Sequence, residues 1–515
     1  MSSPPAPSIV DAALPRPESV ADQDARRWDH AFARAAGAGP SDANAVRMLL
    51  DAEENFPAWL EAIAKAERYI LFESYLILND PRGRMFADAL AAKARAGVRV
   101  YAVFDWFGSL GGRALWEPLR AAGVEVCAFN PPRIDSPLAW LTRDHRKSIV
   151  VDGEVGYVSG LCIDSAWEGD AAKRLEPWRD TGVEIRGPAV LELERAFIAI
   201  WDICGGAPIR ELPTAPAPPQ LAGNVRVRVV AGIPGIAGTY RLDLLVASVA
   251  RRHLWLTDAY FVGTSAYTQA LRAAASDGVD VRLLVPGASD IPALSPLSRA
   301  GYRPLLEAGV RVFEWNGTML HAKTAVADGA WARVGSTNLN LASWMSNYEL
   351  DVAIEDVAFA RTMAEQYERD LARATEIVLT SRNRVRLSEP RAEVAKDAGE
   401  RVARRAASGS AGRAAAGAVS VGSALGAALT NRRALGPAEA GLLGTMALIV
   451  LGLVVVAALW PRVIAWPLAI VGAWLAVSWL LKGWSLWRGG RRGPDVVASS
   501  ASESRARSGN GGDQG

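Results

Sequence analysis

Short apolar runs alternate with amphipathic stretches through the middle of the chain. The runs at 69–78 and 96–106 are predicted to be buried strands, and the stretch at 86–95 between them has the spacing of an amphipathic helix. Strands that alternate with helices in this way are typical of βαβ units, whose sheets are mostly parallel. The hydrophobic pattern therefore predicts an α/β fold.

The same order of elements occurs twice, which indicates a duplicated architecture. Three segments of the first half have counterparts in the second half: 69–78 with 253–262, 96–106 with 277–287, and 119–131 with 305–317. We predict two tandem α/β lobes at 45–205 and 225–380, with a mostly parallel sheet in each. A Pro- and Gly-rich linker at 206–224 joins them, and residues 1–44 form a disordered leader and a first helix.

Two long apolar stretches follow further along the chain. Residues 441–460 contain no charged residue, and the second stretch runs from 467 to 481. A helix of about 20 residues covers the roughly 30 Å hydrocarbon core of a bilayer. We therefore predict a C-terminal transmembrane helical hairpin at 441–487, between a basic linker at 381–440 and a disordered tail at 488–515.

Tryptophan and basic residues flank the predicted hairpin. Trp460, Trp466, Trp484 and Trp487 lie where aromatic residues gather at membrane interfaces, and Lys and Arg are concentrated outside the hairpin rather than in its turn. The positive-inside rule then places both ends of the hairpin, and with them the lobes, on the cytoplasmic side. A buried helical hairpin in a soluble domain is the alternative.

Composition and charge exclude some classes of protein. Half of the residues are hydrophobic, which is too apolar for a wholly disordered chain. The 57 Lys and Arg nearly balance the 55 Asp and Glu, so the net charge is +2. This excludes a strongly basic protein of the kind found in nucleosomes. Three cysteines make no disulfide framework, which fits a reducing compartment. Only four histidines occur, and the position of each is therefore informative: His30, His145, His253 and His321.

Two of these histidines begin the same motif. The motif reads His-x-Lys, four residues and Asp, and its two copies contain His145, Lys147 and Asp152, and His321, Lys323 and Asp328. Side chains two residues apart on a strand share a face, so each His projects beside its Lys. A single His-x-Lys would be weak evidence, but two copies at matching places in a duplicated chain are strong evidence for one function.

This set of side chains suits a phosphodiester substrate. Two ammonium groups can hold the non-bridging oxygens and stabilise the charge that develops there. One imidazole can attack phosphorus and form a covalent phosphohistidine. The other can protonate the leaving oxygen and then deprotonate the incoming alcohol or water. This chemistry requires neither a metal nor another cofactor.

The paired motifs resemble those of the phospholipase D superfamily, and the resemblance covers about 45–380. It implies that the two motifs meet at the lobe interface, with one histidine as the nucleophile and the other as the acid and base. We favour His145 as the nucleophile. The resemblance also implies that Lys147 and Lys323 bind the phosphate, together with Ser336 and Asn338.

Further residues follow from the same resemblance. A downstream carboxylate orients each histidine in this superfamily, and the candidates are Asp180 and Glu349. Asp152 and Asp328 are expected to hold the geometry of the strand and turn rather than to touch the substrate. One departure is that Cys162 stands where the second copy has Asn338, which is expected to weaken that side of the phosphate site.

Four segments look most similar to bacterial cardiolipin synthases of the phospholipase D type: 103–109, 129–133, 143–153 and 178–190. This resemblance implies a membrane-anchored enzyme of the bacterial inner membrane that transfers a phosphatidyl group to phosphatidylglycerol, with phosphatidylglycerol or another phospholipid as the donor. No nucleic-acid partner is expected, and the oligomeric state stays open. The alternatives are a phospholipase D that hydrolyses phospholipids to phosphatidic acid, a nuclease of the superfamily, and a membrane scaffold that has lost its chemistry.

Overall fold

The computed structural model describes residues 20–133, 142–173, 175–207, 209, 221–291, 294–379 and 385–388, together with scattered positions between 451 and 484. The chain divides into two units. The first unit comprises residues 1–129 and 142–438, and the second comprises residues 130–141 and 439–515. The first unit contains all the strands and both copies of the His-x-Lys motif.

In the first half of this unit, three of the seven described strands are parallel to one another, and the other four pair antiparallel. The elements are α1 (Val20–Ala36), β1 (Ser41–Leu50), α2 (Asp51–Lys65), β2 (Tyr69–Ser74), α3 (Pro81–Arg95), β3 (Arg99–Asp105), η1 (Leu110–Leu115), α4 (Trp116–Ala121), β4 (Glu125–Phe129), β5 (Lys147–Val151), β6 (Val155–Ser159), η3 (Ser165–Trp167), η4 (Ala171–Lys173), β7 (Thr181–Arg186) and α5 (Ala189–Cys204). Strands β2, β3 and β4 are parallel, whereas β5, β6 and β7 follow them antiparallel.

The second half repeats this arrangement. Its elements are β8 (Val225–Gly232), α6 (Gly238–Val249), β9 (His253–Thr257), α7 (Ser265–Ser276), β10 (Asp280–Pro286), α8 (Leu294–Glu307), β11 (Arg311–Trp315), β12 (Thr324–Ala327), β13 (Trp331–Gly335), α9 (Leu341–Met345), β14 (Glu349–Glu355), α10 (Val357–Leu371), β15 (Ala374–Leu379) and β16 (Val385–Leu387). Strands β9, β10 and β11 are parallel, and the remaining pairs are antiparallel.

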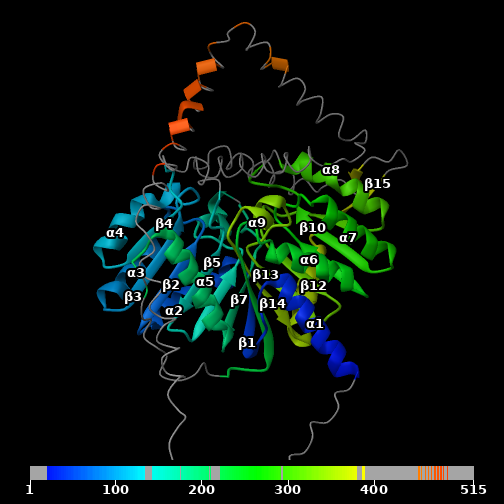
Figure 1. Ribbon diagram of the computed structural model, residues 1–515, viewed down its shortest axis with the longest axis horizontal. Coiled ribbons are helices and arrows are strands. Elements are labelled where there is room, and N and C mark those ends of the chain that lie inside the picture. Colours follow the sequence, from blue (N-terminus) through cyan, green and yellow to red (C-terminus); the bar gives the residue numbers. More distant parts are fainter. Residues whose placement is uncertain are drawn as a thin grey trace, which may run out of the picture. The chain divides into compact units, whose positions relative to one another are not determined.

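Strand β1 joins the two halves because it pairs with β7 on one side and with β8 on the other. All strands therefore belong to one mixed sheet of 16 strands, with the two halves side by side (Figure 1). The predicted α/β fold is confirmed, but the prediction of a mostly parallel sheet in each lobe is wrong. Among the described strands, three in each half are parallel, and these belong to the βαβ units.

The motif strands are antiparallel because an Asp-Gly turn ends each of them. Asp152 and Gly153, and likewise Asp328 and Gly329, adopt positive φ angles between 51° and 67°. Asp-Gly accepts this conformation and favours a tight hairpin, so β5 turns directly into β6 and β12 into β13. The carboxylate of Asp152 also accepts backbone N–H groups of residues 67–69, and that of Asp328 accepts those of residues 251–253.

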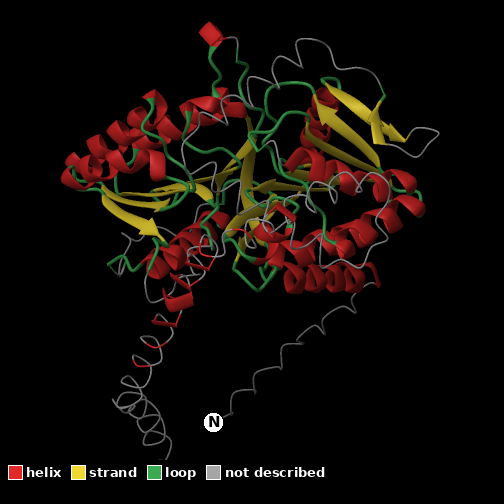
Figure 2. Ribbon diagram, turned by 90° about the horizontal axis from the view of Figure 1, so that it is seen from above, coloured by secondary structure: helices red, strands yellow, loops and turns green. Residues whose placement is uncertain are grey.

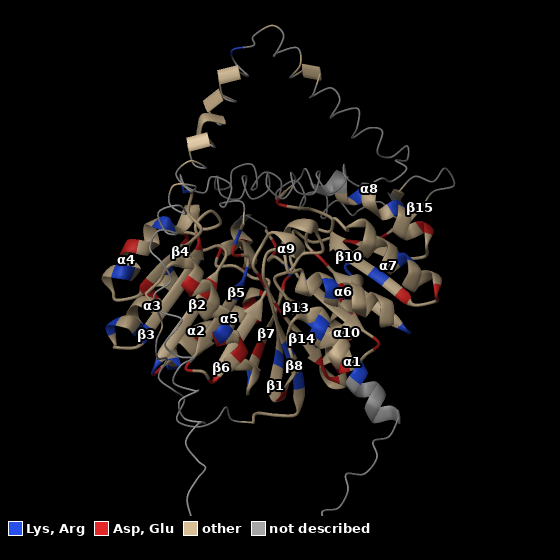
Figure 3. Ribbon diagram, viewed as in Figure 1, with Lys and Arg blue, Asp and Glu red and all other residues tan. Residues whose placement is uncertain are grey.

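Helices cover both faces of the sheet (Figure 2). Helices α2, α3 and α4 pack on one face of the first half, and α6, α7 and α8 pack on the second half. A shared core beneath α5 and α10 unites the halves, because it includes Val183 of β7 together with Val334 of β13 and Val352 of β14. Acidic and basic residues are interspersed over both halves (Figure 3), in keeping with the near-zero net charge.

The predicted hairpin at 441–487 lies largely outside the described residues, as do the leader before residue 20, most of the linker at 206–224 and the tail at 488–515. Within the described part of the chain, no helix has the length and apolar character that a membrane crossing needs. The positions described between 451 and 484 are helical, and large apolar side chains there are exposed: Leu451, Val454, Leu459, Trp466, Ile470, Trp474, Val477, Leu480 and Trp484.

Candidate active site

Glu349, the first residue of β14, holds His145. Nδ1 of His145 lies 2.8 Å from Oε2 of Glu349, which is almost fully buried. The Ser336 hydroxyl donates to the same carboxylate oxygen at 2.6 Å. Burial opposes ionisation of Glu349, but His145 and other favourable neighbours outweigh it and lower the pKa of this carboxyl group. An ionised carboxylate can only accept, so Nδ1 of His145 carries the hydrogen and Nε2 keeps its lone pair.

Asp180, directly before β7, holds His321 in the same way. Nδ1 of His321 lies 2.8 Å from Oδ2 of Asp180, and the indole N–H of Trp167 donates to the same oxygen at 2.9 Å. Burial opposes ionisation of Asp180, yet His321, Lys323 and the indole lower the pKa of this carboxyl group to about 2. Asp180 is therefore ionised at neutral pH, and the reactive nitrogen of His321 is also Nε2.

The histidines and carboxylates are exchanged between the halves of the fold. His145 of the first half pairs with Glu349 of the second, and His321 of the second pairs with Asp180 of the first. Backbone bonds align both pairs: the His145 N–H donates to the carbonyl of residue 348 at 2.9 Å, and the His321 N–H donates to that of residue 179 at 2.7 Å. The sequence indicated both carboxylates, but the prediction that each histidine is oriented by a carboxylate downstream of it is wrong for His321, because its partner Asp180 precedes it in the chain.

Both motif lysines belong to this cluster. Lys147 donates to the carbonyl of His145, and Lys323 donates to that of His321. Burial and the nearby Lys147 lower the pKa of Lys323 to about 8, although Asp180 opposes this. Lys147 also lowers the pKa of His321, and Lys323 lowers that of His145. Oε2 of Glu349 is bonded both to His145 of the first motif and to Ser336, which follows the second motif, so parts of both copies meet where the halves join.

The surroundings of the two imidazoles differ. The His321 ring lies 5.2 Å from the Trp167 ring and 5.8 Å from the Trp178 ring, measured between centroids. Burial and then Lys323 lower the pKa of His321 to about 3, so its imidazole is neutral at pH 7 without a bound anion. The side chain of His145 is 12% exposed against 6% for His321, and burial lowers its pKa too.

The remaining predicted site residues occupy different places. Asn338 is buried, with its amide nitrogen 3.5 Å from the Ser343 hydroxyl. Cys162 is buried in the core of the first half, and burial raises the pKa of its thiol despite both lysines. Asp152 and Asp328 bind backbone N–H groups at the hairpin ends of the motif strands. They lie outside the cluster of histidines and lysines.

A glycine makes room for Asp180. Gly160 stands where the second motif has Ser336, and a Cβ atom at residue 160 would lie 2.2 Å from Oδ1 of Asp180. The serine hydroxyl at residue 336 donates to the carboxylate of Glu349, whereas the glycine at residue 160 leaves space for the carboxylate of Asp180, to which the Trp167 indole donates. Trp167 and Trp178 were missed from the sequence, which gives no local signal for them.

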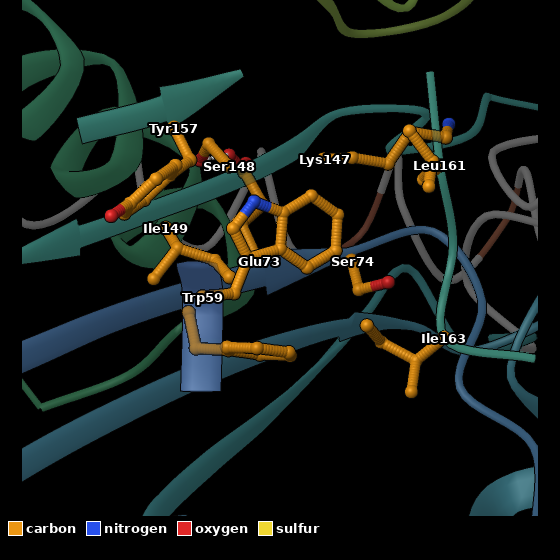
Figure 4. A pocket seen from close by; sticks show the side chains of 10 residues that line it. Trp59, Glu73, Ser74, Lys147, Ser148, Ile149, Tyr157, Leu161 and Ile163 are labelled. Atoms are coloured by element: carbon orange, nitrogen blue, oxygen red, sulfur yellow. Dashed lines mark hydrogen bonds between the residues drawn. The ribbon is translucent and has the colours of Figure 1, made fainter. Parts of the chain in front are cut away.

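A small cavity lies behind Lys147 and is separate from the cluster of histidines. Its volume is about 10 Å³, and Trp59, Glu73 and Lys147 are among the side chains that surround it (Figure 4). The indole nitrogen of Trp59 and Oε1 of Glu73 are buried without hydrogen-bond partners in the described structure. This space suits one water molecule and is far too small for a lipid head group. Among the described residues, no three His, Cys, Asp or Glu side chains are grouped so as to hold a metal.

Comparisons with known proteins agree with this geometry. Residues 246–371 match the family described as cardiolipin synthase, PLD-like domain. The chain is 32% identical over 341 residues to cardiolipin synthase of Alkalihalophilus pseudofirmus, covering 64% of this chain and 67% of the relative. It is 34% identical over 351 residues to cardiolipin synthase A of Pseudomonas aeruginosa, covering 67% of this chain and 70% of the relative.

The fold also resembles a solved structure. Phosphatidylserine synthase of Haemophilus influenzae superposes with a TM-score of 0.53 at 16% identity, covering 70% of this chain and 93% of that chain. This similarity supports the fold alone. The sequence relatives favour a phosphatidyltransferase over the nuclease and scaffold alternatives, and the paired histidines and lysines agree with an enzyme. The chain belongs to the cardiolipin synthase family of the phospholipase D superfamily, and it is a phospholipase D-type phosphatidyltransferase.

Proposed function

We propose that this chain transfers a phosphatidyl group to the hydroxyl of phosphatidylglycerol through a covalent phosphohistidine, and that it releases glycerol or another head-group alcohol. The observation that carries the proposal is the pair of histidines, each held through Nδ1 by a carboxylate of the opposite half and each beside a lysine. We further propose that the lobes at 45–205 and 225–380 act as one catalytic unit.

In the first step, Nε2 of His145 attacks the phosphorus of the donor lipid while the bond to the leaving oxygen breaks. His321 donates its proton to that oxygen. In the second step, the acceptor hydroxyl attacks phosphorus, His321 takes its proton, and the bond between phosphorus and His145 breaks. Lys147 and Lys323 hold the non-bridging oxygens in both steps.

Substrate binding has an electrostatic role in this scheme. Burial and the two lysines keep the pKa of His321 far below its ordinary value in the free enzyme. A phosphodiester anion between the lysines offsets their charge and so raises the pKa of both imidazoles. His321 can then hold the proton that the leaving group needs, with ionised Asp180 stabilising the imidazolium.

We propose that the segment at 441–487 anchors the enzyme in the bacterial inner membrane, with the lobes on the cytoplasmic side. Two observations support this: the apolar stretches of the sequence, and the exposed apolar side chains at the helical positions between 451 and 484. Exposed apolar surface of this kind is typical of membrane contact. A lipid-processing site held at the membrane surface meets its substrate there.

Product analysis tests the proposed transfer. The purified full chain is incubated with phosphatidylglycerol vesicles, and the lipids are identified by mass spectrometry. Cardiolipin and free glycerol are expected. Phosphatidic acid as the sole lipid product would instead identify a hydrolase, because water then takes the place of the acceptor hydroxyl on the same intermediate.

The buried neutral His321 predicts a specific pH dependence of stability. Below about pH 6.5, the unfolded chain binds a proton at this residue, whereas the folded chain, with a pKa of about 3, does not. Stability is therefore expected to fall as the pH decreases from 6.5 towards 3. Asp180, with a pKa of about 2, stays ionised over most of this interval.

The measurement compares the melting temperature of wild type and His321→Gln between pH 7.5 and 4.5. The wild type is expected to lose stability more steeply on acidification than the variant. His30→Gln, which changes an exposed histidine of α1, is the matched control and should keep the wild-type slope. Equal slopes for wild type and His321→Gln would contradict the prediction.

A further inference from the structure

Two tyrosines make matching contacts with the cluster of histidines and lysines, although Tyr75 directly follows β2 and Tyr260 lies three residues after the end of β9. Tyr75 follows β2 and Tyr260 follows β9, and each packs edge-on against the motif histidine of its own half. The centroid distances are 4.9 Å from Tyr75 to His145 and 5.8 Å from Tyr260 to His321. The two motif lysines lie over the same rings, at 5.2 Å and 5.9 Å from the centroids.

The equivalence ends at the phenol oxygens. The Tyr260 hydroxyl donates to Oδ1 of Asp290 at 2.8 Å. Asp290 lies in the loop after β10 and is partly exposed. Among the described residues, no carboxylate accepts a hydrogen bond from Tyr75. Burial is the main cause that raises the pKa of both phenols, and the charge of Asp290 contributes in the same direction at each.

This carboxylate is chemically unsuited to the phosphate itself. A phosphodiester is anionic, and a second negative charge beside it would repel it. A carboxylate instead accepts hydrogen bonds from neutral hydroxyl groups, and its two oxygens together offer about four lone-pair directions. The Tyr260 hydroxyl and, at 3.5 Å, the Ser289 hydroxyl both lie on Oδ1 of Asp290, and these contacts orient the carboxylate. Neutral hydroxyl groups are therefore the kind of ligand that a carboxylate beside this site suits.

We propose that Asp290, positioned by Tyr260, recognises the free hydroxyls of the glycerol head group. This inference rests on the proposed transfer, and it adds a residue that selects a polyol over water and over simple alcohols. The position of Asp290, on the side of His321, agrees with the roles proposed above for the two histidines. Tyr260 contacts His321, the acid and base, and the leaving and incoming alcohol oxygens must lie beside that residue.

The test is a competition between two alcohols with the same number of carbon atoms. Deuterated glycerol and deuterated 1-propanol compete at equal concentration as acceptors for phosphatidylglycerol vesicles treated with the full chain. Mass spectrometry then gives the ratio of labelled phosphatidylglycerol to phosphatidylpropanol. The wild type is expected to favour glycerol. Asp290→Asn should lower the ratio about tenfold or more, because it removes hydrogen bonds to a charged acceptor, while phosphatidylpropanol formation persists.

Two further variants keep the test decisive. Tyr260→Phe removes the phenol that orients Asp290 and should lower the ratio less than Asp290→Asn does. Asp277→Asn removes an exposed carboxylate before the other end of β10 and should leave the ratio unchanged. An unchanged ratio in active Asp290→Asn, or in Tyr260→Phe should Asp290→Asn not fold, would overturn the proposal. A wild type that yields only phosphatidic acid would overturn the transfer function itself.

Discussion

Replacing His145 by alanine is expected to lower phosphatidyl transfer by at least about 10⁴-fold, because the atom that bonds to phosphorus is removed. His321→Ala should lower it by about 10²- to 10⁴-fold through loss of proton transfer. A donor lipid whose leaving group is p-nitrophenol distinguishes the two variants, because this group departs without receiving a proton. His321→Ala should release one equivalent of nitrophenol in a burst and then stall, whereas His145→Ala should show no burst.

The control for this experiment is His253→Ala in β9. This histidine packs against Trp255, outside the motif, so transfer should stay at the wild-type rate. A burst in His145→Ala that is absent in His321→Ala would identify His321 as the nucleophile and His145 as the acid and base. Undiminished transfer in His145→Ala would remove the phosphohistidine at this residue from the mechanism, and undiminished transfer in His321→Ala would remove the role of that residue as acid and base.

The sequence indicated the residues of the candidate site better than the architecture of the sheet. The two motifs were recognisable because the lysine and aspartate offsets are repeated. The hairpin at each motif also had a local signal in the sequence, the Asp-Gly pair. This pair favours an antiparallel hairpin, but the prediction of a mostly parallel sheet did not take it into account. The structure shows that this pair turns the motif strand back on itself.

The cross-pairing of histidines and carboxylates had no local signal. His145 and Glu349 are separated by 204 residues, and His321 and Asp180 by 141, so only the packed fold brings them together. Tyr75 and Tyr260 were more accessible to sequence reasoning, since a tyrosine follows the same strand in both halves. Asp290 has no counterpart in that repeat, and its position beside Tyr260 emerges from the structure alone.

Exchange of the carboxylates makes each half dependent on the other for the tautomer of its histidine. Asp180→Asn tests this dependence, and we expect it to lower kcat by about 10²- to 10⁴-fold while KM changes little. An amide can donate to Nδ1 of His321 and so stabilise the tautomer with its hydrogen on Nε2, and it cannot support the imidazolium. Glu349→Gln should have the same effect through His145.

The pH profile distinguishes this positioning role from a loss of folding. Without the ionised carboxylate, His321 is harder to protonate, so the acidic limb of the kcat profile should move to lower pH in Asp180→Asn. Asp202→Asn, at an exposed position near the end of α5, is the matched control and should keep the wild-type profile. If Asp180→Asn lost activity only in proportion to a lowered melting temperature, with an unmoved profile, Asp180 would serve the packing of the halves, and the tautomer of His321 would have to be set by another group.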